Sequence, residues 1–346
     1  MTRPSPIWTR DRHRDRRPFL IRRNAITRAL RQWFDQQGFV EIEPSALQVS
    51  PGNEAHLHAF ATELVAPDGS RRPLYLHTSP EFAAKKLLAA GEEKIVAFAR
   101  VFRNREAGAL HAPEFTMLEW YRAGAPWEAV IDDTLALIAE AARAAETDVL
   151  AWRDRRADPF AEAERLSVAE AFERFAGIDL AAVLDDRDGL ASRATSRGIR
   201  VADDDSWSDI FSRVIVETVE PRLGETRPSV LHSYPVSEAA LARPQPSDPR
   251  FAERFEVYCC GVELANGFGE LTDAAEQERR FVSEMDEKMR VYSERYPIDA
   301  DFLAALAEMP PASGVALGLD RLAMLATGAP RIEFVQWNPV DRGEAR

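Results

Sequence analysis

Cysteine is scarce in this sequence, which has two among 346 residues, the adjacent Cys259 and Cys260. Their segment has the composition of a strand, where neighbouring side chains point to opposite faces, so we do not expect them to form a disulfide. No cluster of four cysteine and histidine residues is present for zinc. A low cysteine content is typical of a reducing compartment, so we expect a cytoplasmic protein with two buried thiols.

Long apolar runs are also missing. No segment reaches the ~20 consecutive apolar residues of a membrane span, and the arginine-rich start, MTRPSPIWTRDRHRDRRPFLIRR, lacks the apolar stretch of a signal peptide. We therefore expect no association with a membrane. Residues 1–19 are interpreted as a basic N-terminal arm, either a solvated, partly disordered tail or a docking arm for an acidic partner.

An excess of positive charge is missing as well. The chain has 44 lysine and arginine residues against 57 aspartate and glutamate residues, which gives a net charge of −13. This balance argues against broad electrostatic binding to nucleic acid, although it leaves room for a local basic patch. It favours a cationic small substrate or a basic surface on a partner.

Strands and helices do not alternate regularly, and no clear linker divides residues 20–346. The patterns predict helices over 24–38, 80–90, 273–292 and 319–327 and strands over 95–103, 114–122 and 254–271. Residues 124–222 have a mostly helical pattern, with loops or helix junctions at 154–164 and 185–198. This mixture predicts one α+β domain built on an antiparallel sheet.

The segment FRNREAGALHAPEFTMLEWYR, residues 102–122, combines arginines, a histidine and an alternating strand. On a strand, Phe115, Glu119 and Tyr121 share one face. A planar base can stack on the phenylalanine with Arg103 against its phosphates, while an amine meets the carboxylate and phenol. The alternative is a surface hairpin of mixed charge.

Two carboxylates, Glu263 and Glu270, flank the sequence LANGFG. Seven residues place them on opposite faces of an unbroken strand, but Gly267 and Gly269 favour a turn that brings them together. Together they can hold Mg²⁺, which takes oxygen ligands. Alternatively, one binds the metal and the other a substrate ammonium, or both are unrelated surface acids.

The segment GVALGLDRLAML places Arg321 in an otherwise apolar helix. A buried arginine needs an anionic or aromatic partner, which is either a ligand or an internal acid such as Asp320. Gly314 and Gly318 permit a close approach of the backbone to a ligand.

Taken in order, GFVEIEPS, FRN with HAPEFTMLEWY, and GVALGLDRL resemble the three motifs of the class II aminoacyl-tRNA synthetases. TSPEFAAKKLL and GVELANGFGEL are similar to the lysyl branch, and the resemblance covers residues 20–336. It implies a class II synthetase-like antiparallel sheet flanked by helices, with residues 20–346 as the catalytic domain. The first motif forms a dimer interface in that family, so a homodimer is implied.

Lysyl-tRNA synthetases carry an anticodon-binding OB domain before the catalytic core. Here the first motif begins within about forty residues of the start, which leaves no room for the five strands of that domain. The sequence is therefore more similar to stand-alone paralogues, the elongation factor P–lysine ligases. That family uses ATP and Mg²⁺ to activate lysine, preferably (R)-β-lysine, and transfers it to a lysine ε-amine of elongation factor P.

The resemblance also implies roles for individual residues. Catalysis is assigned to Arg103, Glu263 and Arg321, acting by positioning and electrostatics. The implied ATP site consists of Arg103, Asn104, Arg105, His111, Phe115, Glu263, Leu264, Gly318 and Arg321. The implied substrate site consists of Ser79, Pro80, Glu81, Tyr121, Asn266, Glu270 and Ala316, and the implied metal ligands are Glu263 and Glu270.

Two positions depart from the synthetase pattern. Arg105 stands where the second motif has glutamate, so either Glu106 takes that role or the contact is lost. Ala316 stands where lysyl-tRNA synthetases have glycine, as it does in the ligases. One extra methyl group in a tight pocket changes selectivity by about 1–3 kcal/mol, which favours an isomer with a displaced amine.

Two other functions remain open from the sequence. The chain is either a lysyl-tRNA synthetase that uses an anticodon domain in trans or a non-catalytic, lysine-sensing regulatory paralogue. The acidic net charge argues against tRNA binding. The presence of Arg103, Glu263, Glu270 and Arg321 argues against a loss of catalysis.

Overall fold

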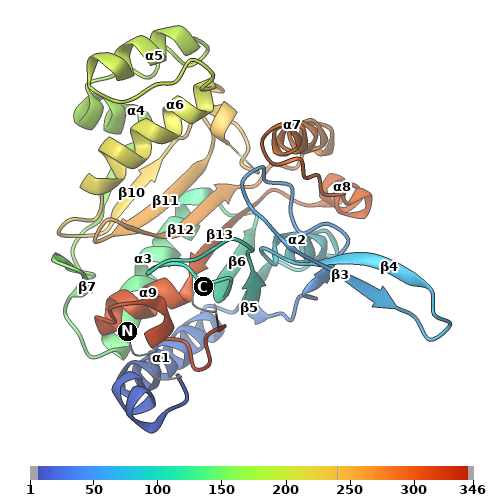
Figure 1. Cartoon of the computed structure of the whole chain (residues 1–346), viewed down its shortest axis with the longest axis vertical. Coiled ribbons are helices and arrows are strands. Elements are labelled where there is room, and N and C mark those ends of the chain that lie inside the picture. Colours follow the sequence, from blue (N-terminus) through green and yellow to red (C-terminus); the bar gives the residue numbers. More distant parts are fainter. Residues whose placement is uncertain (1–6, 240, 342–346) are drawn as a thin grey trace, which may run out of the picture.

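The computed structural model describes residues 7–239 and 241–341, and within them the largest sheet has eight strands (Figure 1). In spatial order these are β1 (Val40–Glu41), β5 (Lys94–Phe102), β6 (Glu114–Ala123), β13 (Ala312–Gly318), β12 (Val262–Gly269), β11 (Arg254–Cys259), β10 (Ser229–His232) and β9 (Glu164–Ser167). The strands from β5 to β10 pair antiparallel, whereas β1 and β9 join the two edges in parallel. The predicted α+β class is confirmed.

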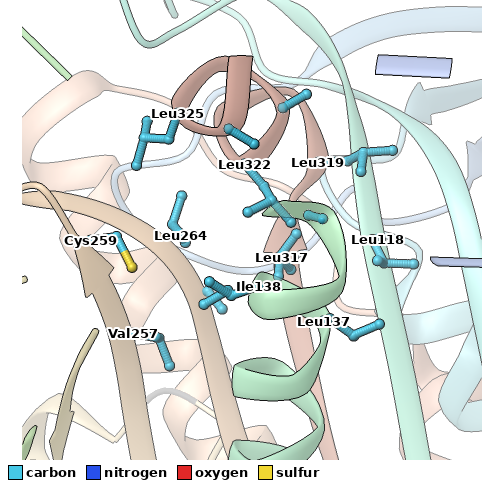
Figure 2. Packing of buried hydrophobic residues seen from close by; sticks show 14 of the residues in the cluster. Leu118, Leu137, Ile138, Val257, Cys259, Leu264, Leu317, Leu319, Leu322 and Leu325 are labelled. Carbon is cyan, nitrogen blue, oxygen red and sulfur yellow. The ribbon is translucent and has the colours of Figure 1, made fainter. Parts of the chain in front are cut away.

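One face of this sheet is covered by α1 (Arg10–Gln36), α3 (Trp127–Ala144) and α9 (Leu319–Thr327). Leu118 and Trp120 of β6 point into this layer and are fully buried. The indole Nε1 of Trp120 donates to Asp133 Oδ2 of α3 at 3.2 Å. Figure 2 shows Leu118, Leu317 and Leu322 in the same apolar cluster. Truncating one such leucine costs about 2–5 kcal/mol, so this layer holds the sheet in place for the opposite face.

The opposite face of the sheet is covered only in part, by α2 (Glu81–Ala89), α7 (Ala274–Tyr292) and α8 (Ala300–Glu308). Phe82 of α2 stacks on Phe302 of α8 with ring centroids 4.0 Å apart. Both rings belong to a cluster with Ile95 and Tyr121 of the sheet. The helices therefore border an open region of the sheet on this side.

The remaining elements lie around this core (Figure 1). A second apolar cluster against β10 and β11 contains α4 (Val168–Ala171), η1 (Phe172–Ala176), α5 (Arg187–Ser196), α6 (Trp207–Val214) and η2 (Ile215–Val219). A small sheet is formed by β2 (Leu47–Gln48), β4 (Arg71–Leu76) and β3 (Phe60–Val65), and a hairpin by β7 (Leu150–Trp152) and β8 (Arg155–Ala157). The single-turn 3₁₀ segments are η3 (Glu220–Arg222), η4 (Val236–Glu238) and η5 (Ile332–Phe334).

Helix α1 starts earlier than the predicted helix over 24–38. It is continuous from Arg10 to Gln36, so no element ends between residues 19 and 20. Arg16 is 2% exposed and donates to the main-chain oxygens of Glu333, at 3.1 Å, and Gln336. Residues 10–19 therefore pack as part of the domain, while residues 1–6 lie outside the described ranges. A docking role for this basic segment stays a prediction.

Two other sequence predictions of local structure are wrong. Residues 185–198 hold helix α5, which Asp186 caps by accepting a hydrogen bond from the Gly189 amide at 2.8 Å. Residues 254–271 form a hairpin rather than one strand, because Cys260 and Gly261 adopt φ of 57° and 69° and reverse the chain. Cysteine rarely adopts this conformation, so Gly261 was the signal in the sequence for this turn. Both thiols are free and buried, as expected.

The described residues contain no helix with the length and apolar character needed to span a membrane.

Candidate active site

A cavity of about 240 Å³ lies on the partly covered face of the sheet. Its floor is formed by β6, β13 and β12, where Gly314 pairs with Tyr121 and Ala316 pairs with both Glu119 and Asn266. Residues directly opposite each other in antiparallel strands share a face. All five of these residues line the cavity.

Most of the predicted site residues line this cavity. They are Ser79, Glu81, Arg103, His111, Phe115, Tyr121, Glu263, Leu264, Asn266, Glu270, Ala316, Gly318 and Arg321. Pro80, Asn104 and Arg105 do not line it. Glu106 does, and so do Glu119, Glu54 and Arg254.

The predicted alternation along β6 is confirmed. Phe115, Met117, Glu119 and Tyr121 line the cavity, while Leu118 belongs to the core on the other face. The surface-hairpin alternative fails because Glu119 and Tyr121 are only 2% and 3% exposed.

Glu263 and Glu270 reach the cavity face for a reason that the sequence did not reveal. No turn forms at the glycines, and β12 runs straight through them. The register against β11 instead shifts between Val257 and Tyr258, so that one residue of β12 is extra. Such a bulge reverses the alternation of side chains, so Glu263 joins the face that Asn266 and Glu270 occupy.

The two carboxylates nevertheless lie far apart along the strand. A rise of about 3.3 Å per residue separates their Cα atoms by roughly 20 Å, which is too far for one ion to bind both. The expectation that they converge on a shared metal is therefore wrong. The other hypothesis, one carboxylate for a metal and one for an ammonium, agrees with this spacing.

Arg103 lies at the cationic end of the cavity, just beyond β5. Its Nε donates to the main-chain oxygen of Thr78 at 3.2 Å, and its guanidinium carbon lies 5.5 Å from the centroid of the Phe115 ring. The hydrogen bond fixes the side chain while leaving other guanidinium donors for a ligand. A cation beside an aromatic ring suits the phosphate and base of a nucleotide.

Arg321 of α9 supplies a second cation at this end. Its Nη1 donates to the main-chain oxygen of Glu263 at 3.0 Å, and its Nη2 lies 2.8 Å from His111 Nε2. Asp320, considered as its partner from the sequence, pairs instead with Arg23 at 2.7 Å. Arg321 Nη1 instead lies 3.5 Å from Glu263 Oε2, so its internal acid is Glu263, and its guanidinium stays on the cavity wall, 23% exposed.

The loop after Arg103 contains Arg105, which stands where the motif has glutamate, and the neighbouring Glu106. Arg105 adopts a φ of 63°, does not line the cavity, and pairs with Glu294, two residues after the end of α7. Its Nη1 also lies 3.4 Å from His58 Nε2. Glu106 lines the cavity with its carboxylate 3.8 Å from His111 Nε2. The carboxylate that the motif has at position 105 is therefore supplied to the cavity wall by the next residue, Glu106.

Glu119 organises the opposite, carboxylate-rich end of the cavity. It accepts hydrogen bonds from Ser79 Oγ and from Tyr121 OH, each at 2.6 Å. Burial, reinforced by Glu81, raises the pKa of Glu119 to about 8. Burial, with Glu119 next, likewise raises the pKa of Tyr121 well above its ordinary value, which keeps the phenol as a donor.

Lys85 is a residue of this end that the sequence analysis missed. It is 1% exposed and its Nζ lies 2.6 Å from both Glu81 Oε1 and Glu270 Oε2. Although burial acts against its charge, the two carboxylates raise its pKa above the ordinary value. The four-residue spacing of Glu81 and Lys85 on a helix could have predicted that the two side chains pair. The sequence showed no sign of the second partner, Glu270, which comes from a distant strand.

Gly314 leaves room for the side chains of Tyr121 and Glu270 to pack against β13 at the carboxylate-rich end of the cavity. A Cβ atom at this position would lie 2.3 Å from Tyr121 Cε1 and 2.5 Å from Glu270 Oε1. From the sequence, this glycine was expected to let a ligand approach the backbone. In the structure the space beside it is filled by side chains of the protein itself. The oxygen of the Asn266 amide, on the same face, is buried without a hydrogen-bond partner. It is therefore available to a ligand.

Within the described ranges, no three histidine, cysteine, aspartate or glutamate side chains gather closely enough to hold a metal. Mg²⁺ often uses only one or two carboxylates and completes its shell with phosphates and water. Glu263, beside the cationic end, fits this manner of binding. Glu270 does not, because it lies at the far end of the cavity, away from the cations that suit phosphates.

Comparisons with known proteins agree with this geometry. Residues 3–342 match the family of class II tRNA synthetases (D, K and N). The chain is 39% identical over 318 residues to the elongation factor P–(R)-β-lysine ligase of Haemophilus influenzae strain PittGG, covering 91% of this chain and 93% of the relative. It is 37% identical over 327 residues to the protein of that name from Vibrio cholerae, covering 93% and 95%. The protein of that name from Salmonella arizonae is 39% identical over 329 residues, covering 94% and 96%.

The sheet, the cavity and these matches define a catalytic domain of the class II tRNA synthetase type. Within that class, the chain belongs to the family of elongation factor P–(R)-β-lysine ligases. The resemblance drawn from the motifs is thus confirmed at the level of the family.

Proposed function

We propose that this enzyme activates lysine, preferably (R)-β-lysine, with ATP and transfers it to a lysine ε-amino group of elongation factor P. One observation carries the proposal: a single cavity has cations and an aromatic ring at one end and buried carboxylates at the other. Arg103, Phe115 and Arg321 suit ATP, while Glu119 and Glu270 suit an amino acid with an additional amine. Its relatives carry the name of this activity.

In the first reaction, a carboxylate oxygen of lysine attacks the α-phosphorus of ATP and pyrophosphate leaves. In the second, the deprotonated ε-amine of the acceptor attacks the acyl carbon, the bond to the adenylate oxygen breaks, and AMP leaves as the amide nitrogen loses a proton. Neither reaction needs a protein nucleophile. The chain contributes by positioning the reactants and stabilising the charge that develops at the phosphorus, which we assign to Arg103.

The roles of the other nucleotide-site residues are proposed from the family resemblance, and their place on the cavity wall supports them. Phe115 and Arg321 hold the adenine between them, and His111 approaches the terminal phosphates. Glu263 would hold Mg²⁺, which would neutralise phosphate charge when bound. The methyl group of Ala316 narrows the floor between Glu119 and Asn266, which supports selection of the isomer.

The finer properties are proposed on separate observations. Val40, Leu47, Leu64 and Val65, in β1 to β3, are 45–52% exposed apolar residues and support a homodimer through this region. The low cysteine content supports a cytoplasmic location. The net charge of −13 supports a protein acceptor in place of tRNA.

The decisive experiment is lysine-dependent ATP–pyrophosphate exchange, run with Mg²⁺ and with α-lysine and (R)-β-lysine separately. We expect exchange with both and a higher kcat/KM for the β isomer. Transfer of the labelled amino acid is then compared between purified elongation factor P and tRNA. Charging of tRNA alone would favour a synthetase, and no exchange with either isomer would favour a regulatory paralogue.

The affinity for the amino acid should depend on pH because Glu270 is buried. Burial, partly offset by Lys85, raises the pKa of Glu270 to about 7. Below that pH the carboxyl group is neutral and cannot pair with a substrate ammonium, which stays protonated up to a pKa of about 10. The KM for lysine should therefore fall roughly tenfold between pH 6 and pH 8.

The variant Glu270→Gln is the control for this pH dependence. Its amide is neutral throughout, so its KM should be high at both pH values and any residual slope should report Glu119. An equal slope in the wild type and in Glu270→Gln would show that Glu270 does not carry the effect.

A further inference from the structure

A second cavity, of about 700 Å³, adjoins the active site and has no role in the two reactions as described above. It lies between the loop of residues 50–57, the start of α2, the start of α6, the segment of residues 236–241, Arg254 of β11 and one side of α7. The two cavities share the lining residues Glu54, Leu57, Ser79, Glu81, Leu241 and Arg254. An occupant of the second cavity is thus in contact with the wall of the first.

Carboxylates outnumber cations in the lining of the second cavity, although Glu81 is paired with Lys85 and burial raises the pKa of Glu54. Seven carboxylate side chains line it, against two arginines. One of these arginines, Arg280, is paired with Glu276 of the same helix at 2.9 Å. The field of such a cavity attracts cations and repels nucleotides.

Gln277 of α7 gives a second and independent indication of a ligand. Its side chain lines the cavity and is 1% exposed, yet neither its amide nitrogen nor its amide oxygen has a hydrogen-bond partner. A buried amide without partners is unfavourable, and such groups are uncommon in folded proteins. A peptide group offers both the acceptor and the donor that this side chain lacks.

We propose that the second cavity receives the segment of the acceptor protein that carries the lysine to be modified. Gln277 hydrogen-bonds to the main chain of that segment. The acidic lining attracts the lysine ammonium and guides it past Ser79 and Glu81 to the acyl group. This inference rests on the proposed function, and it names the route by which the second substrate reaches the same site.

The variant Gln277→Leu tests the hydrogen bonds. We expect the Kd for elongation factor P, measured by calorimetry with the full-length chain, to rise roughly tenfold. The KM for elongation factor P in transfer should rise by a similar factor, while pyrophosphate exchange stays within about twofold. The Tm should be equal or higher, because an apolar side chain of similar shape replaces an unpartnered amide.

The variants Glu287→Gln and Glu278→Gln test the charge. Both residues belong to α7, but only Glu287 lines the cavity. We expect Glu287→Gln to weaken binding of elongation factor P about two- to threefold and to reduce its dependence on salt. Glu278→Gln should leave both unchanged.

Two results would overturn the inference. An unchanged Kd in Gln277→Leu would show that this side chain does not contact the acceptor. A parallel loss of exchange and transfer would assign the cavity to ATP or lysine. If the wild type shows no exchange, the proposed function fails, and the calorimetric comparison still decides separately whether the cavity binds the protein.

Discussion

Replacing Arg103 by glutamine should lower kcat for adenylate formation by about 10²–10³-fold, the usual effect of removing one group that stabilises developing charge. Arg103 lines the cavity beside Phe115 and is held in place by the main-chain oxygen of Thr78. Its loss removes the cation that we assign to the α-phosphate. Lysine-dependent pyrophosphate exchange at saturating ATP measures this effect.

The matched control is Arg105→Gln, two residues along the same loop. Arg105 was also predicted to bind ATP, but it pairs with Glu294 outside the cavity. We expect less than about a tenfold change in exchange, mainly through a looser loop and a higher KM for ATP. Equal losses in the two variants would mean that the loop moves when ATP binds and brings Arg105 to the phosphates.

Replacing Lys85 by methionine should destabilise the fold by about 3–5 kcal/mol, because it leaves buried carboxylates without their cation. Lys85 lies 2.6 Å from both Glu81 and Glu270, and it is 1% exposed. The loss should be larger at pH 8 than at pH 6, since Glu270, with a pKa raised to about 7 by burial, takes up a proton at the lower pH. Denaturant unfolding at both pH values measures the difference.

The neighbouring Lys86 provides the control for Lys85. Its side chain is 28% exposed and pairs with Asp299 and Asp301, so Lys86→Met should cost about 1 kcal/mol or less. If Lys85→Met does not fold, the double variant with Glu270→Gln should restore folding by removing one unpaired carboxylate. Equal unfolding free energies for the two single variants would contradict the role given to Lys85.

The strand of residues 114–122 shows how far periodicity alone can predict a site. Its side chains alternate without interruption, so the face with Phe115, Glu119 and Tyr121 could be assigned before the fold was known. The bulge between Val257 and Tyr258 could not, because no residue there is typical of such backbone, and the hairpin turn had Gly261 as its one signal beside a cysteine at positive φ. The carboxylate pair was therefore placed on the correct face for the wrong reason.

The sequence by itself determined the family, the alternating face of β6 and most of the cavity residues, because these depend on local spacing and on ordered motifs. Only the tertiary structure decided which acids and bases neutralise one another. Lys85 against Glu270, and Arg105 against Glu294, are contacts between distant segments whose strength depends on burial and distance. For the same reason the second cavity, whose walls come from six separate parts of the chain, became visible only in the folded protein.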